Sequence, residues 1–433
     1  MRKTYAELRE ETNYDNLVSG LRSDFTKIQD KRAKNIQHTL PDVLMSGYAI
    51  FSLKYPSMLC FEQQPDSERE NFKRLFHVEK LCSDAQMRRV LDDVSPDTLQ
   101  QLFPKRFAQL KKLGVLSDYR FMKKYYLISA DGVHYFQSKK INCERCTVKE
   151  HRNGERSYHH SMLSAALVHP RRREVFTLGG EAIEKQDGII KNDCELNAAK
   201  RLQSNLYEAY KGMPFIMVED ALYANGPHIK QIKENGWDFI INVKPKSHKT
   251  LFKLFEARKL RGQLKTHTLK EGKHTHHFYW MNNVPLNNQA DQRVNFMYYE
   301  EYSSKGKVRR FSWVTSIQLR KSNVCEMMRG GRARWKIENE AFNTLKNQGY
   351  HFKHNYGHGH NHLSDVMARL MLLAFLSDQM IQCFDRLFNL IWKAAGARVR
   401  IWETMRAVYL IKAVNSFNEL LTEVAKIYRV QLE

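Results

Sequence analysis

The chain has 433 residues, 42% of them hydrophobic and 27% charged, which excludes both a small disulfide-stabilised module and a wholly disordered protein. Lys and Arg total 70 against 47 Asp and Glu, so the formal net charge is +23. Such an excess indicates a polyanionic partner. Nucleic acid is the usual one, because neutralised phosphates release counterions, and an anionic membrane surface is the weaker alternative.

Neither secretion nor a membrane span is expected from the sequence. The seven cysteines are an odd number scattered along the chain, which argues against a disulfide framework. The N-terminal stretch MRKTYAELREETNYDNL lacks the apolar segment of a secretory signal. The apolar run VMARLMLLAFL contains Arg369 and is too short to span a bilayer, so it predicts a buried helix.

Residues 15–115 have helical signals and predict a basic, mostly α N-terminal region. Ser83-x-x-Gln86 is a capping box, and Ser95-Pro96 is a cap followed by a first-turn proline. The polar stretch from Glu62 to Asn71 predicts a loop.

A mixed α/β region follows. Short apolar runs predict strands at Tyr125–Ala130, Ser161–Val168, Glu174–Gly180, Pro214–Asp220 and Asp238–Pro245. The first should end in a turn at Asp131-Gly132. Before the fourth strand, an Asn192-x-x-Glu195 capping box opens an amphipathic helix that carries Leu196, Ala199, Leu202, Leu206 and Tyr210. Strands and helices in this order predict a mixed sheet flanked by helices.

Residues 250–320 are again rich in β-forming segments and predict a β insertion separate from the core sheet. Its aromatic side chains either offer stacking surfaces to nucleic acid or fill a small β core; they are Tyr279, Trp280, Tyr298 and Tyr299. Helices are predicted for residues 323–347 and 363–430. The histidine-rich HFKHNYGHGHNH between them predicts a loop that faces the nucleic acid, with an ordinary connection or a metal site as alternatives.

Three acidic residues are candidates for a metal site. Asp131 and Asp220 follow predicted strands, at the sheet edge where α/β proteins bind ligands. Taken alone, Asp131-Gly132 could equally be a simple turn. Glu338, in the helix RARWKIENEAFNTLK, is the third acid. Three carboxylates that meet repel one another unless a divalent cation neutralises them, and Mg²⁺ or Mn²⁺, as two ions about 4 Å apart, can drive phosphodiester cleavage.

Basic residues surround Glu338 on this helix. Arg334, four residues before it, could bind a DNA phosphate bidentately or form a simple surface ion pair. Lys346 lies eight residues after it, and Arg329, Arg332 and Lys336 extend the same basic patch. The apolar side chains of the helix are expected in the core; they are Trp335, Ile337, Phe342 and Leu345.

Four features in chain order resemble the DDE transposases of insertion sequences, most closely the IS-four-like group. They are a strand followed by DG, a strand followed by ED and ALYANGPHI, a β insertion, and a helix with the sequence RxRWxIENExFNTLK. The resemblance implies an RNase H-like core with Asp131, Asp220 and Glu338 as catalytic, metal-binding acids and Arg334 as the signature arginine. In that signature a tyrosine stands where this chain has Gly331, and the lysine falls at Leu345, one residue before Lys346.

The resemblance also implies a domain plan and a function. We expect an N-terminal helical DNA-binding region at 1–118, the RNase H-like core at 119–248 and 321–380, a β-rich insertion at 249–320 and C-terminal helices at 381–433. The protein would bind terminal inverted repeats, cut the DNA and transfer the ends to target DNA, as a homodimer associated with the nucleoid in the cytoplasm. The alternatives are a catalytically silent regulator that binds DNA, and a stand-alone nuclease of the same fold.

A second metal site is suggested by Cys143-x-x-Cys146, which His151 and then His159-His160 follow. Thiolate and imidazole are the ligands that zinc prefers. The spacing of the histidines is longer than in zinc fingers, so structural Zn²⁺ at Cys143, Cys146 and His151 is weighed against two free cysteines in a loop, which the sequence favours.

Overall fold

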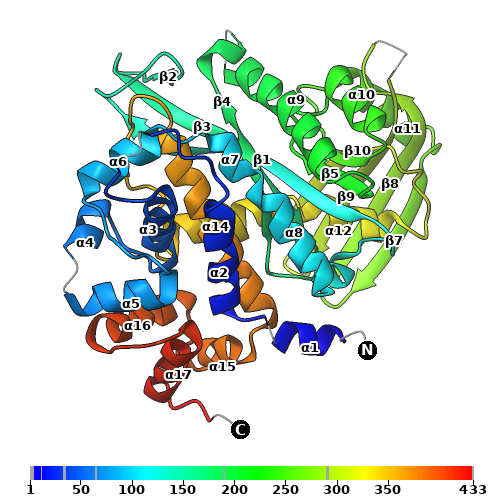
Figure 1. The fold of residues 1–433 in the computed structure, drawn as a ribbon. Helices are drawn as coiled ribbons and strands as arrows, with labels where there is room; N and C mark the ends of the chain where they lie inside the picture. The colour runs from blue at the N-terminus through cyan, green and yellow to red at the C-terminus, as the bar shows by residue number, and fades with distance from the viewer. Residues whose placement is uncertain are drawn as a thin grey trace.

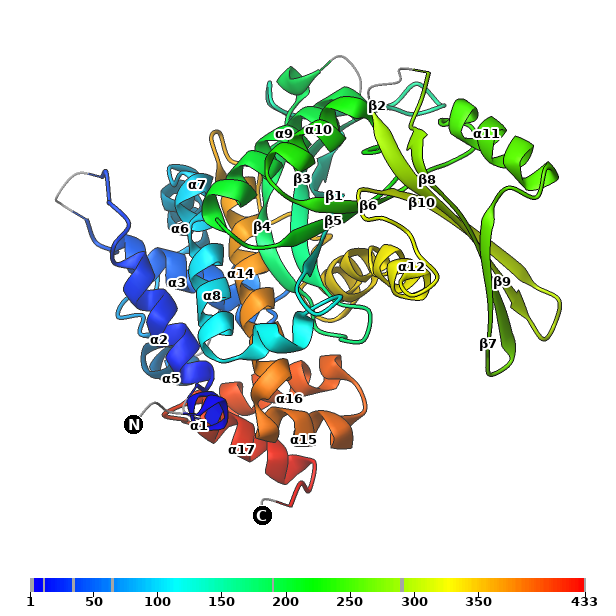
Figure 2. The ribbon, with the colours of Figure 1, turned by 90° about the vertical axis from the view of Figure 1, so that its right-hand side faces the viewer.

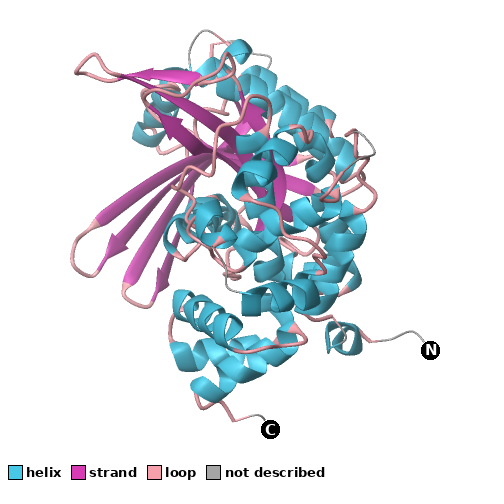
Figure 3. Ribbon diagram, turned by 60° about the vertical axis from the view of Figure 1, so that its left-hand side comes forward, coloured by secondary structure: helices cyan, strands magenta, loops and turns pink. Residues whose placement is uncertain are grey.

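A computed structural model describes residues 4–10, 12–32, 36–63, 66–188, 191–288 and 292–431. Within these residues, ten strands form a single mixed sheet. Helices from both ends of the chain gather on one side of this sheet, as Figures 1 and 3 show.

Five strands in the order β4-β3-β1-β5-β6 make the centre of the sheet. Their bounds are β1 Tyr126–Ser138, β3 Arg156–Val168, β4 Phe176–Ile183, β5 Phe215–Glu219 and β6 Asp238–Asn242. The first three pair antiparallel, whereas β5 and β6 run parallel to β1. Helix α9 (Lys191–Ala209) joins β4 to β5, and α10 (Gly226–Glu234) joins β5 to β6. This topology is RNase H-like, and the predicted fold class is confirmed.

The central strands are apolar because helices cover both faces of the sheet. Figure 2 shows α9 and α10 on one face and α12 (Val324–Arg332) on the other. Two glycines let α12 lie close to the sheet. A Cβ on Gly330 would meet the Phe121 ring at 2.8 Å, and one on Gly331 would meet Trp313 Nε1 at 2.5 Å.

The predicted β-rich insertion is present after β6, but it extends the same sheet, so the expectation that it is separate from the core sheet was wrong. Helix α11 (Lys249–Leu260) leads into the strands β7 Lys265–Glu271, β8 His274–Pro285, β9 Arg293–Ser303 and β10 Val308–Thr315. β10 pairs with β6, with Trp313 opposite Asn242. The physical reason is that β6 would otherwise leave its backbone groups unpaired at an open edge.

The four aromatic residues of this extension that were predicted either to stack on nucleic acid or to fill a small β core differ in how deeply they are buried. Trp280 and Tyr299 are buried, whereas Tyr279 and Tyr298 are partly buried and pack against Phe255 of α11. Most of these rings therefore contribute to a small apolar core on the extension.

The N-terminal region is α-helical, as predicted. Its helices are α1 Tyr5–Glu10, α2 Tyr14–Phe25, α3 Leu40–Ser52, α4 Met58–Glu62, α5 Asp66–Phe76, α6 Asp84–Asp92, α7 Pro96–Gln100 and α8 Leu102–Lys112, followed by the 3₁₀ turn η1 Val115–Tyr119. Ser83 caps α6 through the backbone N–H of Gln86, whereas Ser95 makes no side-chain cap bond.

The predicted loop from Glu62 to Asn71 was largely wrong, because α5 begins at Asp66. Its polar residues misled the prediction. Phe72, Leu75 and Phe76 of the same helix are buried, so the charged residues are the outer face of an amphipathic helix.

The apolar run near Leu370 lies in α14 (Leu363–Phe384), which contacts α3, α6 and strand β4. By length and composition α14 could cross a membrane, but 94% of its apolar window is buried inside the protein. The predicted buried helix is confirmed. The last helices, α15 Arg386–Ala395, α16 Arg398–Ile411 and α17 Phe417–Ile427, pack beside α2 and α5, so the two ends of the chain share one core (Figure 1).

Candidate active site

Asp131 lies within β1, and the predicted turn at Asp131-Gly132 was wrong. β1 pairs with β5 only from Tyr126 to Ser129, but it continues to Ser138 because β3 keeps pairing with it. Asp131 is therefore the second residue beyond the last pair with β5, at the place where these neighbouring strands diverge. Its side chain is 24% exposed.

Asp220 directly follows β5, as predicted. Its Oδ1 accepts a hydrogen bond of 2.8 Å from the backbone N–H of Leu222, which orients the carboxylate. Asp220 and Asp131 line the same cleft, which has a volume of about 670 Å³. Two of the three predicted acids therefore face one space.

Glu338 lies on a π-helical turn, η3 (Ile337–Phe342), between α12 and the short helix α13 (Asn343–Asn347). Single π turns inside helices are frequent at functional sites. Oε1 of Glu338 lies 2.7 Å from Nη1 of Arg334, and the same Nη1 lies 3.6 Å from Oδ2 of Asp131. The structure thus brings Glu338 and Asp131 together around one guanidinium.

The pKa of Asp131 is raised to about 7, because burial and then the neighbouring Glu338 carboxyl disfavour its charged form, while Arg334 acts in the opposite direction. One guanidinium does not fully offset two carboxylates. Hard oxygen ligands that lack compensating charge beside an open cleft fit a divalent cation.

Arg334 is buried, with a side chain only 7% exposed, and its charge is directed at the two acids. Its backbone carbonyl accepts a 3.1 Å hydrogen bond from the Ser129 hydroxyl of β1, which fixes the segment of Arg334 and Glu338 against the sheet. The guanidinium also lies 4.7 Å from the centre of the Trp335 ring. As the structure stands, Arg334 faces the carboxylates and not the protein surface.

The other predicted DNA-binding residues occupy three different settings. Lys346 is exposed on α13. Nη1 of Arg332 lies 3.2 Å from Glu301, so this side chain joins α12 to β9. Nζ of Lys336 donates to the carbonyl of Arg172, and burial lowers the pKa of Lys336. Of these three, Lys346 has the most accessible charge.

Three of the four apolar side chains predicted for the core are buried there; they are Ile337, Phe342 and Leu345. Trp335 was predicted wrongly, since it is 45% exposed. Position 331 has no room for a signature tyrosine, because Trp313 of β10 occupies the space into which its side chain would project.

Two further charged residues of the cleft, Glu195 and Lys244, were not predicted from the sequence. Glu195 of α9 lines the cleft and accepts a 2.8 Å hydrogen bond from the Tyr223 hydroxyl. Its capping-box motif had already given it a local role, and the side chain of Asn192 lies outside the described residues. Lys244, just after β6, adds a positive charge to the wall of the cleft. The position of Lys244 just after a predicted strand was the sequence signal that could have placed it at the cleft.

The predicted zinc ligand His151 lies elsewhere, with Nε2 2.8 Å from the Ser157 hydroxyl. Cys143 and Cys146 instead face His160 and, from the histidine-rich loop, His358. The ligand set of Cys143, Cys146 and His151 was therefore wrong, because strand β3 turns His160 toward the cysteines.

Comparisons with known proteins bear on this geometry. No curated protein matches the chain. A cryo-EM structure of a piggyBac transposase synaptic complex with hairpin DNA is similar, with a TM-score of 0.42 and 10% identity over 98% of this chain and 84% of that one. Residues 196–376 match the family model of the transposase DDE domain. This segment contains Asp220 and Glu338, and Asp131 precedes it. Residues 196–376 are therefore similar to the transposase DDE domain.

Proposed function

We propose that this protein is the transposase of an insertion sequence of the IS-four-like group, which cuts DNA at the ends of its element and joins those ends to target DNA. Transposases act on DNA, and the net charge of +23 suits a polyanionic substrate. The observation that supports the proposal most is the convergence of three distant acids, with Asp131 and Asp220 on one cleft and Glu338 beside Asp131.

Asp131, Asp220 and Glu338 would hold Mg²⁺ or Mn²⁺, as two ions. A pair of such ions activates water toward a phosphodiester and stabilises the leaving oxygen. Arg334 orients Glu338 through the 2.7 Å ion pair, and the N–H of Leu222 orients Asp220. Lys244 offers a positive charge to a DNA phosphate in the cleft. No covalent link between the protein and DNA is needed, so no Ser or Tyr acts as nucleophile.

The remaining parts of the chain would hold the DNA. We assign the terminal inverted repeats to the helical region 1–118, and the bases near the cut to the extension at 249–320. Lys346 and Trp335, both exposed close to Glu338, suit a phosphate contact and a base-stacking contact. A homodimer on nucleoid DNA in the cytoplasm would pair the two ends.

The test is cleavage of end-labelled DNA that carries the flanking sequence of the gene, with Mg²⁺ or Mn²⁺ and without metal. The wild type should cut at the repeat boundary and leave 3′-OH ends, and then join them to target DNA. Asp131→Asn, Asp220→Asn and Glu338→Gln should each reduce cleavage by about 10³-fold or more and still bind the DNA.

Glu340→Gln is the matched control, because Glu340 lies on the same π turn but pairs with Arg173 at 3.5 Å. It should cut like the wild type. Full-rate cleavage by Asp220→Asn would refute the site. Specific binding without any cutting by the wild type would favour the silent regulator, and cutting without regard to the repeats would favour the nuclease.

A further inference from the structure

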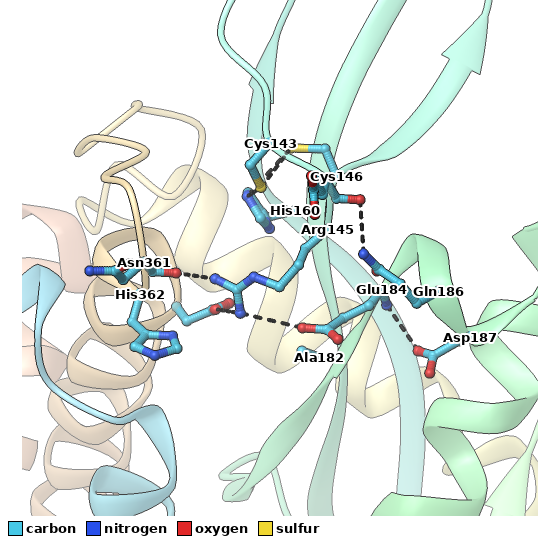
Figure 4. Close-up of polar contacts among 12 residues, drawn as sticks. Cys143, Arg145, Cys146, His160, Ala182, Glu184, Gln186, Asp187, Asn361 and His362 are labelled. Atoms are coloured by element: carbon cyan, nitrogen blue, oxygen red, sulfur yellow. Dashed lines mark hydrogen bonds and ion pairs between the residues drawn. The ribbon is translucent and has the colours of Figure 1, made fainter.

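Four metal-ligating side chains meet on the far side of β3 from the cleft. Cys143 and Cys146 lie in the connection between β1 and β2 (Thr147–Glu150), His160 lies on β3, and His358 comes from the loop between α13 and α14. Their ligand atoms all lie within 4.8 Å of one another. Figure 4 shows both cysteines turned toward His160.

Five of the six distances between these atoms lie near those of a tetrahedral site, and the sixth, between Cys143 and His358, is at most 4.8 Å. A tetrahedral zinc ion with Zn–S of about 2.3 Å and Zn–N of about 2.0–2.1 Å sets sulfurs about 3.8 Å apart, sulfur and nitrogen about 3.5 Å apart and nitrogens about 3.3 Å apart. The Sγ atoms of Cys143 and Cys146 are 3.8 Å apart. Nε2 of His160 lies 3.6 Å and 3.4 Å from them, in that order. Nε2 of His358 lies 3.6 Å from Cys146 and 3.0 Å from His160.

The protonation of His358 also fits a metal ligand. Its Nδ1 lies 2.6 Å from the carbonyl of Gly359, and since a carbonyl only accepts, Nδ1 is the donor. In a neutral imidazole this leaves a lone pair on Nε2, which faces the other three ligands. A backbone carbonyl on the second nitrogen is the usual way in which proteins orient a metal-bound histidine.

Neither a disulfide nor hydrogen bonding alone accounts for the cluster as well as a metal ion does. A disulfide needs sulfurs about 2.05 Å apart, far closer than these. If hydrogen bonds alone held the cluster, the donors would be thiols, which form only weak hydrogen bonds. Such bonds also do not explain why four soft ligands lie together in a largely buried place, where Cys146 and His160 are 1% and 5% exposed. Two thiolates and two imidazoles in a tetrahedron are typical of zinc.

We propose that Cys143, Cys146, His160 and His358 form a structural zinc site, independent of the proposed transposase activity. The four protein ligands leave no open position for a substrate, which distinguishes a structural zinc from a catalytic one. On binding, the two thiols release their protons to solvent and coordinate as thiolates.

The zinc would fasten the loop of His358 to the sheet. Beside the site, Arg145 donates to the carbonyl of Asn361 (Figure 4). Arg145 also pairs with Asp365 at 3.5 Å, and the hydroxyl of Tyr135 donates to Asp365. This loop connects the segment of Glu338 to α14. The ion would therefore hold the end of the catalytic segment in place without touching the substrate.

The test is the metal content of the full chain after purification and a chelator wash, measured by inductively coupled plasma mass spectrometry. We expect one zinc per chain in the wild type. Cys143→Ser and His358→Asn should retain less than a tenth of it and unfold at lower temperature. His151→Asn is the matched control and should keep its zinc, because His151 contacts Ser157.

Asp220→Asn should also keep its zinc, which separates this proposal from the proposed activity. If a ligand variant does not fold, zinc-edge X-ray absorption of the wild type decides, with two sulfurs at about 2.3 Å and two nitrogens at about 2.0 Å expected. A folded wild type without stoichiometric zinc, with both thiols open to alkylation, would overturn the site. Zinc retained by both ligand variants, or coordinated only by oxygen, would overturn it as well.

Discussion

Gly331 and Trp313 occupy one space between α12 and the sheet, and their contact decides which side chain position 331 can hold. Trp313 is 1% exposed, and a Cβ on Gly331 would lie 2.5 Å from its Nε1. An indole from β10 thus fills the space next to position 331, which leaves no room there for the tyrosine of the signature.

Gly331→Ala should therefore lower the free energy of unfolding by about 1–3 kcal/mol, because overpacking outweighs the gain in helix propensity. Combining it with Trp313→Phe should cost less than the sum of the two single changes. Urea unfolding of the four proteins of this cycle measures both effects.

Gly226→Ala at the start of α10 is the control, since a Cβ there would lie 3.5 Å from its nearest neighbour. It should unfold almost like the wild type. A stable Gly331→Ala, or strict additivity in the double variant, would show that position 331 has more room than the distances allow.

The start of α14 depends on another element of the fold. His362 gives no side-chain cap, and the carboxylate of Asp92, at the end of α6, accepts hydrogen bonds from the backbone N–H groups of His360, Asn361, His362 and Leu363 at 2.8–3.0 Å. Burial alone would raise the pKa of Asp92, but these four donors outweigh it and hold the pKa below its usual value.

Asp92→Asn should lower the free energy of unfolding at pH 7 by about 2 kcal/mol, because an amide cannot accept on both sides. The lowered pKa means that the carboxylate stabilises the fold above its unfolded pKa of about 4, and that this contribution is lost as the pH falls further. The difference between wild type and variant should thus shrink between pH 5 and pH 3. Urea unfolding across this range checks it, with the exposed neighbour Asp93→Asn as control.

At the scale of elements, the sequence was informative where local patterns decide the structure. The buried strands, helix α9 and the apolar face of the Glu338 segment follow from periodicity and caps. The length of β1 and the pairing of β10 with β6 do not, because distant strands decide them. The π turn at Glu338 is equally invisible, because the buried Ile337, Ala341 and Leu345 are spaced along the sequence as in an ordinary α-helix.

The same distinction, between features that local sequence decides and features that distant segments decide, applies to the candidate site. Asp131, Asp220 and Glu338 could be selected as candidates because acids after strands and the Arg334–Glu338 signature are local features. His358 was not assigned to the cysteines, because its loop is distant from them in the sequence and meets them only in the folded protein. Glu195 had an adequate local role as part of a helix cap, so nothing in the sequence pointed to the cleft.

For the whole molecule, the charge of +23 favours binding to DNA, and such binding should depend strongly on salt. If 6 to 10 phosphates are contacted, affinity should fall by about 10³- to 10⁵-fold between 50 and 200 mM salt. Lys346→Gln should reduce the slope of log affinity against log salt by about 1.

Lys426→Gln removes the same charge from α17, where Lys426 pairs with Glu423 at 2.6 Å, and serves as the control. It should leave the slope unchanged. Fluorescence anisotropy of labelled DNA at several salt concentrations gives both values. Equal slopes for the two variants would show that Lys346 does not contact the DNA.

The packing of α3 against α14 also has a consequence for the nascent chain during its synthesis on the ribosome. At about 5–20 residues per second, the ribosome needs roughly 20–60 s to make the residues between Ser52 and Phe384. Until then, the part of α3 that packs against α14 lacks its native partner, although α2, α5 and α6 are already present. Slow production, by cooling or by weak expression with ample chaperone, should therefore raise the yield of folded protein more than any change of buffer after lysis.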